Sequence, residues 1–178
     1  MNREIPHTMS SIAEQLKHPQ ILVPGHQIND RSIKVPKVAG IYAWYFKTLP
    51  SQDIDFTNCW LQQGAYLLYV GISPRKPPAN GKPPSKGTLR SRISSHMRGN
   101  SSSSTLRYSI GCLLSQTLGI QLRRVGKDER LYFLKGEDIL SAWLEENALV
   151  TWIPYKEPWL IMYSDDTLPV IPMIPCQF

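Results

Sequence analysis

The sequence predicts one α+β domain, in which a pair of antiparallel strands is followed along the chain by helices. Its 178 residues, 42% of them hydrophobic, are enough for one packed domain. Two runs rich in aromatic and β-branched residues, 38–46 and 66–72, predict strands. After Thr88 the apolar residues recur at helical spacing. No internal repeat and no break in composition calls for a second domain.

The N-terminal part is expected to be an arm with one short helix. Ser11 and Glu14 form a capping-box pattern, which predicts a helix that ends before Pro19. Proline, glycine and asparagine then mark an irregular approach to the first strand. The expected division of the chain is an arm at 1–37, a domain at 38–159 and an atypical C-terminal tail at 160–178.

The two strands are joined by a long connection, residues 49–63, and their pairing is expected to be antiparallel. Residues 66–72 are apolar on both faces, which indicates a central position in the sheet. Residues 73–87 contain five prolines, four basic residues and two glycines. A helix or an inner strand cannot accommodate that composition, so the segment predicts an exposed loop.

Helices and a hairpin are expected beyond this loop. Thr88 can cap a helix that ends at Arg98, with Leu89, Ile93 and Met97 as its buried stripe. The four serines at 101–104 predict a flexible connector without a catalytic role. The remaining expected elements are a helix at 105–119, a hairpin at 122–134, a helix at 138–147 with Ile139, Leu140, Trp143 and Leu144 facing inward, and a strand at 149–155.

Basic residues concentrate in one acid-free segment. Residues 56–127 contain eleven Lys or Arg and no Asp or Glu, whereas the rest of the chain has nine basic and fourteen acidic residues. Protein surfaces normally mix both signs, so a segment of this length without acids indicates a polyanionic partner. Phosphate backbones are the commonest polyanions that a cytosolic protein meets. A basic amphipathic helix suited to a membrane surface is absent.

Several classes of protein are excluded by what the sequence lacks. Its longest apolar run is too short to span a bilayer, and its N-terminus has no secretory pattern. The three cysteines are widely separated and form no CxxC pair, which excludes a cysteine-rich zinc site and suits a reducing compartment. We therefore expect a cytoplasmic protein. Phosphate-binding glycine loops, HExxH and a GxSxG elbow are also absent.

Four polar side chains are expected on neighbouring elements beside the basic loop. Gly40-Ile41-Tyr42 lies in the first strand, and Tyr69-Val70-Gly71 lies in the second. Arg92 and His96 are spaced i, i+4 on the next helix, one row beside its buried stripe. Taken singly, the tyrosines would be core aromatics and the arginine and histidine would be surface charges. Their order and their place in the acid-free segment favour a shared site.

This ordered set resembles the GIY-YIG nuclease family. The stretch 104–111, Trp143 to Asn147 and the Pro158-Trp159 pair also look like a stand-alone branch of that family, so the resemblance covers 38–159. It implies a small three-stranded antiparallel sheet flanked by helices, which agrees with the elements expected above. It also implies an endonuclease that hydrolyses DNA phosphodiester bonds with one divalent ion, Mg²⁺ or Mn²⁺.

The resemblance also implies a role for each residue of the set. Tyr42 would deprotonate the attacking water, directly or through a second water, with Tyr69 assisting. Arg92 would hold the scissile phosphate and stabilise its developing charge, which suits phosphoryl transfer. His96 would orient Tyr42 or relay its proton. The basic residues expected to grip backbone phosphates are Arg75, Lys76, Lys82, Lys86, Arg90, Arg98 and Arg107.

The end of the chain departs from the family pattern. The family has a metal-binding glutamate shortly after the Pro-Trp pair, but no glutamate follows Glu157 here. Asp165 and Asp166 are the acids nearest to that place, and prolines three residues apart predict an extended tail. The metal ligand stays open among these three acids. If none serves, the protein is a nucleic-acid-binding module with weak or no catalytic activity.

The nature of the partner stays open in two further respects. Single-stranded, duplex and branched DNA, and RNA, all fit a basic face of this kind. A weaker alternative is an interaction protein whose basic loop binds an acidic protein partner. No separate recognition domain is present, which favours a preference for nucleic-acid structure or for a short motif over a long recognition site.

Overall fold

The computed structural model describes residues 7–30, 32–52, 55–57 and 59–162. Its centre is an antiparallel sheet in the order β1-β7-β2-β4-β3. Three long strands form the middle of this sheet: β2 (Gly40–Phe46), β4 (Ala65–Ser73) and β7 (Ala148–Pro154). Two-residue strands, β1 (Val23–Pro24) and β3 (Leu61–Gln62), complete its edges.

The sheet therefore has five strands, whereas the resemblance implies three. The two additional strands pair only at the edges, β1 with β7 and β3 with β4. A strand of two residues carries no alternation that could be read from a sequence. The antiparallel pairing of the long strands agrees with the expectation. The middle one of the three is β2, which lies between β4 and β7, whereas the sequence indicates a central position for residues 66–72.

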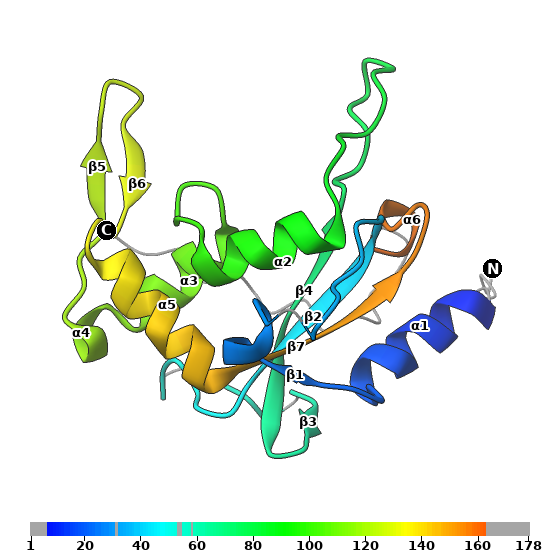
Figure 1. The fold of residues 1–178 in the computed structure, drawn as a ribbon, viewed down its shortest axis with the longest axis horizontal. Coiled ribbons are helices and arrows are strands. Elements are labelled where there is room, and N and C mark those ends of the chain that lie inside the picture. The colour runs from blue at the N-terminus through cyan, green and yellow to red at the C-terminus, as the bar shows by residue number, and fades with distance from the viewer. Residues whose placement is uncertain (1–6, 31, 53–54, 58, 163–178) are drawn as a thin grey trace.

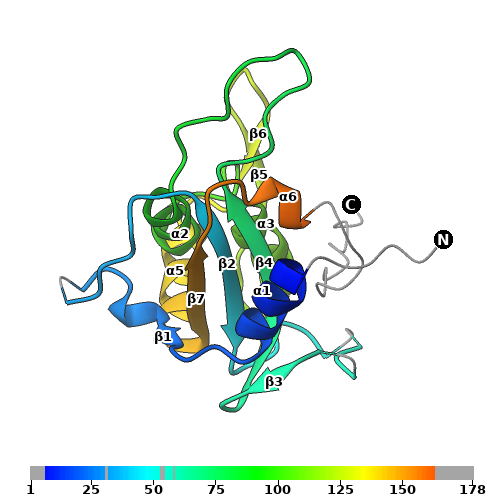
Figure 2. The same cartoon turned by 90° about the vertical axis from the view of Figure 1, so that its right-hand side faces the viewer.

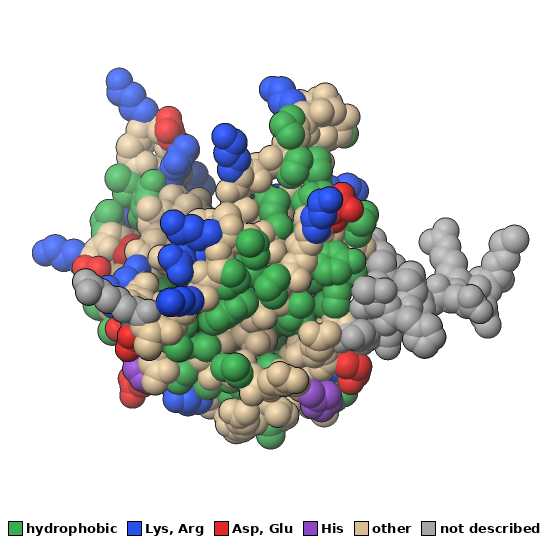
Figure 3. Space-filling view, turned by 45° about the vertical axis from the view of Figure 1, so that its right-hand side comes forward, with side chains coloured by type: hydrophobic (Ala, Val, Ile, Leu, Met, Phe, Trp, Pro, Cys, Tyr) green, Lys and Arg blue, Asp and Glu red, His purple; other side chains and the backbone are tan. Residues whose placement is uncertain are grey.

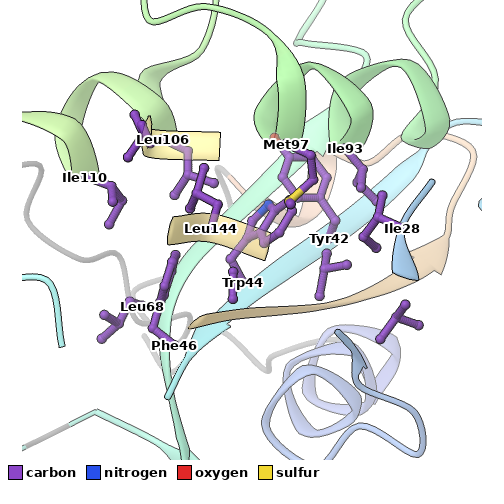
Figure 4. Close-up of a cluster of buried hydrophobic side chains, with 14 of the residues drawn as sticks. Ile28, Tyr42, Trp44, Phe46, Leu68, Ile93, Met97, Leu106, Ile110 and Leu144 are labelled. Atoms are coloured by element: carbon purple, nitrogen blue, oxygen red, sulfur yellow. The ribbon is translucent and has the colours of Figure 1, made fainter. Parts of the chain in front are cut away.

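Helices cover both faces of the sheet (Figures 1 and 2). One face packs against α1 (His7–Lys17), with Ile12 and Leu16 buried against Ile41, Ala43 and Tyr45. The other face packs against α2 (Leu89–Arg98) and α5 (Gly136–Asn147) in the larger apolar cluster shown in Figure 4. Alternate residues of β2 supply the two clusters, because successive strand side chains point to opposite faces. This alternation directs Tyr42 toward α2.

The remaining described elements lie around this core. They are η1 (Gly25–Gln27), α3 (Thr105–Leu113), α4 (Ser115–Leu118), β5 (Arg123–Val125), β6 (Arg130–Tyr132) and α6 (Trp159–Met162). The hairpin expected at 122–134 is confirmed as β5 and β6, which form a separate two-stranded sheet. The helix expected at 105–119 is divided at Leu114 into α3 and α4.

The ends of the helices follow capping chemistry. Thr88 caps α2 in a capping box: its hydroxyl accepts from the N–H of Ser91, and the Ser91 hydroxyl accepts from the N–H of Thr88. The expected stripe of α2, namely Leu89, Ile93 and Met97, is fully buried. On α5 the expectation is wrong for Ile139, which is 46% exposed, because helical spacing from Leu140 and Leu144 turns it toward solvent.

A bulge in β4 aligns its aromatic residues with the face under α2. Trp44 pairs with Tyr69 and Tyr45 pairs with Leu67, so Leu68 is the additional residue. Leu68 and Tyr69 consequently both pack in the cluster beneath α2, while Leu67 packs on the opposite face. A regular strand would place residues 67 and 69 on the same face. The bulge therefore lets Tyr69 face α2 while Leu67 stays in the core beneath α1.

The N-terminal segment is packed onto the sheet through α1 and β1. Residues 160–162 of the expected tail belong to α6, and the rest of the tail, with Asp165 and Asp166, lies outside the described residues. The division into an arm, a domain and a tail stays a prediction. Within the described part of the chain, no helix combines the length and the apolar character needed to cross a membrane.

Candidate active site

Two glycines allow the close packing on which the site depends. A β-carbon on Gly71 would collide with the hydroxyl and ring of Tyr42, which lies directly across from it in the β2–β4 pair. A β-carbon on Gly40 would collide with the carbonyl of Ile153 and the side chain of Leu89. The glycines of the two motifs thus bring the Tyr42 ring across β4 and let α2 begin close against the sheet.

An aromatic group encloses the buried His96 between the sheet and α2. The ring centroid of His96 is 5.3 Å from that of Tyr42, 5.7 Å from that of Tyr69 and 6.1 Å from that of Trp44. The rings of Tyr42 and Tyr69 stack with their centroids 6.3 Å apart. Figure 4 shows Tyr42 and Trp44 directed from β2 toward α2, where Met97 lies.

His96 connects Tyr42 to the loop that follows α2. Its Nε2 is 2.8 Å from the Tyr42 hydroxyl, and its Nδ1 is 2.7 Å from the hydroxyl of Ser104. Ser104 is also the N-cap of α3, where its hydroxyl oxygen accepts a hydrogen bond from the N–H of Arg107. All three side chains that form this chain of contacts are at most 1% exposed.

The hydrogen-bond network assigns the tautomer of His96. If the Ser104 hydroxyl accepts from Arg107 and donates to Nδ1, and the Tyr42 hydroxyl donates its own hydrogen to Tyr69, every polar group of this buried chain has a partner. His96 then carries its hydrogen on Nε2 and donates it to the Tyr42 oxygen. The opposite tautomer would make Ser104 accept twice and leave its own hydrogen without a partner in this chain. The network therefore favours Tyr42 as an acceptor from His96.

Arg92 provides a second donor to the same oxygen. Its Nε lies 3.4 Å from the Tyr42 hydroxyl, and its Nη1 donates to the carbonyl of Ser103 at 2.9 Å. Arg92 is half-buried, so its guanidinium reaches both the buried tyrosine and the surface. A guanidinium has five N–H donors in a planar fork, which suits binding of a phosphate.

The electrostatics of the site keep both rings neutral in the free protein. Burial raises the pKa of Tyr42 well above its usual range, Tyr69 raises it further, and Arg92 opposes these effects. Burial also lowers the pKa of His96 well below its usual value, with Arg92 and Arg107 acting in the same direction. A phenol in this state becomes a base only when neighbouring positive charge favours the phenolate.

Arg107 is buried behind His96 and supports the site there, whereas the sequence predicts that it binds backbone phosphates at the surface. Its side chain is fully buried and paired with Glu137 of α5 at 2.9 Å. It also donates to the carbonyl of Met97 at 2.8 Å and to that of Glu137 at 2.7 Å. These bonds join α2, α3 and α5 behind His96. A cation enclosed in this way cannot reach a backbone phosphate, and Arg107 is therefore not carried into the proposed binding surface.

The serine run is an ordered part of the site and not the flexible connector that its composition predicts. Ser101 is 4% exposed and donates to Glu137 through both its N–H and its hydroxyl, at 2.9 and 2.6 Å. Ser104 contacts His96 as described above. Burial raises the pKa of the Glu137 carboxyl, but the hydrogen bonds from Ser101, Arg107 and Phe133 outweigh it, and the net pKa is lowered. The signal available in the sequence was the helix-capping position of Ser104.

The other expected phosphate-binding residues lie on the surface. Arg75, Lys76, Lys82 and Lys86 are exposed on the loop at 73–87, and Arg90 and Arg98 are exposed on α2. Arg98 pairs with Glu145 at 2.8 Å. Arg90 donates to the carbonyl of Val35 and lines a hollow of about 470 Å³ on the outer side of α2. The loop therefore places four basic side chains at the surface of the molecule.

The acidic residues do not form a metal site in the described part of the chain. No group of three or more His, Cys, Asp or Glu side chains there could hold an ion. Glu137 and Glu145 are engaged by arginines, and Glu157 is exposed just before α6. The described residues thus do not fit a metal centre by themselves. Asp165 and Asp166 lie outside the described residues.

Comparison with known protein families matches the chain to the GIY-YIG catalytic domain over residues 40–165, which is well over half of the chain. The match begins at the first glycine of β2 and includes β2, β4, α2 and β7. Comparison with curated proteins and with solved structures gives no significant match.

Proposed function

Because the chain belongs to the GIY-YIG catalytic domain family, we propose that it is a divalent-metal-dependent endonuclease acting on DNA. Proteins of this family are typically endonucleases that use divalent metal ions. The observation that carries the proposal is the convergence of His96 Nε2, at 2.8 Å, and Arg92 Nε, at 3.4 Å, on the Tyr42 oxygen, with His96 as the donor in the tautomer favoured above. Two donors on one phenol oxygen stabilise the phenolate that a base requires.

Tyr42 is proposed as the base that takes a proton from the attacking water, directly or through a second water. His96 donates to Tyr42 and orients its oxygen, which makes the orienting role of His96 more consistent with its contacts than the relay role. The phenol proton can leave through Tyr69, which hydrogen-bonds to Tyr42 and is only half-buried. Proton transfer of this kind contributes about 10² to 10⁴ in rate.

Arg92 is proposed to hold the scissile phosphate beside Tyr42. Its Nε and Nη1 are engaged by Tyr42 and Ser103, which fixes the plane of the guanidinium and leaves other N–H groups for phosphate oxygens. The positive charge opposes the negative charge that accumulates on the phosphate in the transition state. The same charge favours ionisation of Tyr42, so phosphate binding and base activation share one side chain.

A bound Mg²⁺ or Mn²⁺ would supply a Lewis acid that polarises the phosphate and lowers the pKa of an attacking water. Because the described residues do not fit a metal centre, no step is assigned to a particular ligand. The second candidate function is a nucleic-acid-binding module of the same fold with weak or no cleavage. It is favoured by the absence of a carboxylate cluster among the described residues.

An endonuclease assay tests these two functions against each other. Labelled single-stranded, duplex and branched DNA would be incubated with the protein in Mg²⁺, in Mn²⁺ and in EDTA. We expect metal-dependent cutting that Arg92→Ala reduces about 10³-fold. Lys17→Ala, which removes a cation from α1 on the opposite face of the sheet, is the control. Binding without cutting of any substrate, RNA included, would contradict the nuclease function and support the binding module.

A further inference from the structure

Two basic projections rise from the same side of the molecule, one beyond each end of α2. The first is the loop at residues 73–87, called here the basic loop. The second is the pair β5–β6 with its turn, residues 123–132, called here the basic hairpin. Figure 1 shows α2 between them, and in the perpendicular view of Figure 2 both still rise from the same side. Lys and Arg side chains lie on both projections and on the surface between them (Figure 3).

The basic hairpin contributes little to the fold. None of its residues belongs to either buried cluster, and its strands form a two-stranded sheet separate from the central one. Isolated two-stranded hairpins gain little stability from their own pairing. A polar hairpin that is retained without a core role is more simply explained by a contact that it makes with a partner.

Its charges are available to that partner. The hairpin has four basic residues, and two of them form ion pairs: Arg124 with Glu129 at 3.3 Å and Arg130 with Asp128 at 3.8 Å. Arg123 and Lys127 are exposed and form no ion pair within the described residues. Both belong to the acid-free segment at 56–127. The hairpin therefore presents two uncompensated cations opposite the basic loop.

The base of the hairpin is connected to α2, which carries Arg92 and His96. Phe133 follows β6 directly; its ring packs over Gly111 of α3, and its N–H donates to Glu137 at 3.2 Å. Glu137 in turn holds Arg107, which donates to the carbonyls of His96 and Met97 on α2. These contacts fix the base of the hairpin, at Phe133, relative to Arg92 and Tyr42.

We infer that the basic hairpin is a second nucleic-acid-binding arm, and that it and the basic loop contact the two phosphate backbones of one DNA duplex lying across α2. The basic loop and the basic hairpin, with α2 between them, match the two strands of a duplex, since each strand carries one negative charge per phosphate. A single strand has only one phosphate backbone and would leave either the basic loop or the basic hairpin without a partner. This inference deepens the proposed nuclease function and rests on it for the position of the scissile bond.

The test measures binding without cleavage. A fluorescent 25-base-pair duplex would be titrated with the protein in EDTA at several salt concentrations, and the slope of log K against log salt determined. The variant Arg123→Gln/Lys127→Gln removes the two uncompensated charges. The matched control Arg124→Gln/Glu129→Gln removes an ion pair of the same hairpin and leaves its net charge unchanged. A third variant, Lys82→Gln/Lys86→Gln, changes the basic loop.

We expect Arg123→Gln/Lys127→Gln to reduce the salt slope by about 1.8 and the affinity about three- to tenfold, because each phosphate contact contributes about 0.9 to the slope. The basic-loop variant should have a similar effect, and the control should match the wild type. An unchanged slope for Arg123→Gln/Lys127→Gln, beside a reduced one for the basic loop, would overturn the inference. An equal loss on a single strand of the same length would overturn the duplex assignment.

Failure of the arm and failure of the nuclease function are distinguishable here. If the hairpin variant weakens duplex binding but the wild type never cuts DNA, the arm stands and the binding module replaces the nuclease. If the wild type cuts DNA and the hairpin variant binds normally, the nuclease stands and the arm is wrong. A wild type that does not bind nucleic acid at all would overturn both and favour an acidic protein partner.

Discussion

Tyr42 and Tyr45 lie three residues apart on β2 and face opposite sides of the sheet. Both are almost completely buried, and burial raises the pKa of each phenol. Tyr45 donates its hydrogen bond to the backbone carbonyl of Leu16 in α1, whereas Tyr42 contacts His96 and Arg92. A carbonyl can only accept, but a histidine and an arginine can orient the phenol and stabilise its anion. The difference shows that burial does not mark a candidate base, and that the chemistry of its partners does.

The largest expected effect on stability concerns the ion pair between Arg107 and Glu137, which lies behind His96. Arg107→Ala would remove a fully buried cation from the partly buried Glu137, and loss of one partner of a buried ion pair costs about 3–5 kcal/mol. Urea unfolding followed by circular dichroism would measure this loss. Arg98→Ala, which breaks the exposed pair with Glu145, should cost less than about 1 kcal/mol. Equal losses for the two variants would contradict a structural role for Arg107.

Ser104 offers a sharper test of what orients Tyr42. Ser104→Ala removes the donor to His96 Nδ1, so we expect a tenfold or larger loss of cleavage rate and a shift of His96 away from the Nε2–H tautomer. Nitrogen chemical shifts of the imidazole report the tautomer independently of activity. Ser104→Thr keeps the hydroxyl and should restore both properties, while Ser102→Ala on the exposed part of the loop should change neither. An unaltered tautomer in Ser104→Ala would refute the assigned network.

Burial of His96 should make the stability of the protein depend on pH. Because burial lowers the pKa of His96 well below 6.5, the unfolded chain takes up a proton as pH falls through about 6.5 while the folded chain does not. Stability is therefore complete above pH 6.5 and is lost below it, by about 1.4 kcal/mol between pH 7.5 and 5.5. Unfolding free energies at these two pH values would measure the loss. His96→Gln should abolish this part of the pH dependence, and its persistence there would assign it to other groups.

The smallest expected effect concerns the opposite face. Tyr45→Phe removes one hydrogen bond to Leu16 and keeps the ring, which should cost about 1 kcal/mol of unfolding free energy. Denaturant unfolding would detect this change, and a loss above about 3 kcal/mol would show that α1 depends on this bond more than its apolar contacts suggest.

The sequence predicts the parts of this molecule that are local. The strands β2 and β4, the helix α2 with its Thr88 cap and the order of Tyr42, Tyr69, Arg92 and His96 follow from periodicity and motif spacing. The structure brings these four side chains together, while their roles stay proposals. Edge strands of two residues, and the bulge that turns Tyr69 toward α2, depend on pairing across the sheet and leave no pattern in one strand.

The supporting polar network could not be predicted for a different reason. Arg107 and Glu137 are thirty residues apart, and an arginine in an acid-free segment has the same sequence signature whether it is buried or exposed. A count of charges therefore places Arg107 and the basic loop in one group. Arg107, however, holds α2, α3 and α5 together, whereas the basic loop lies in solvent. The buried contacts of Ser101 and Ser104 could not be predicted either, because both belong to a run of serines whose composition is typical of a linker.

The most direct test of the proposed site is a single-turnover cleavage measurement on Tyr42→Phe and Tyr45→Phe. Both substitutions remove one hydroxyl from a buried ring on the same strand, so each controls for the packing effect of the other. With saturating protein and either Mg²⁺ or Mn²⁺, we expect Tyr42→Phe to cut at least 10²-fold more slowly than the wild type while binding DNA equally well. Tyr45→Phe should cut at the wild-type rate. Equal rates for the two variants would contradict the assignment of Tyr42 as the base.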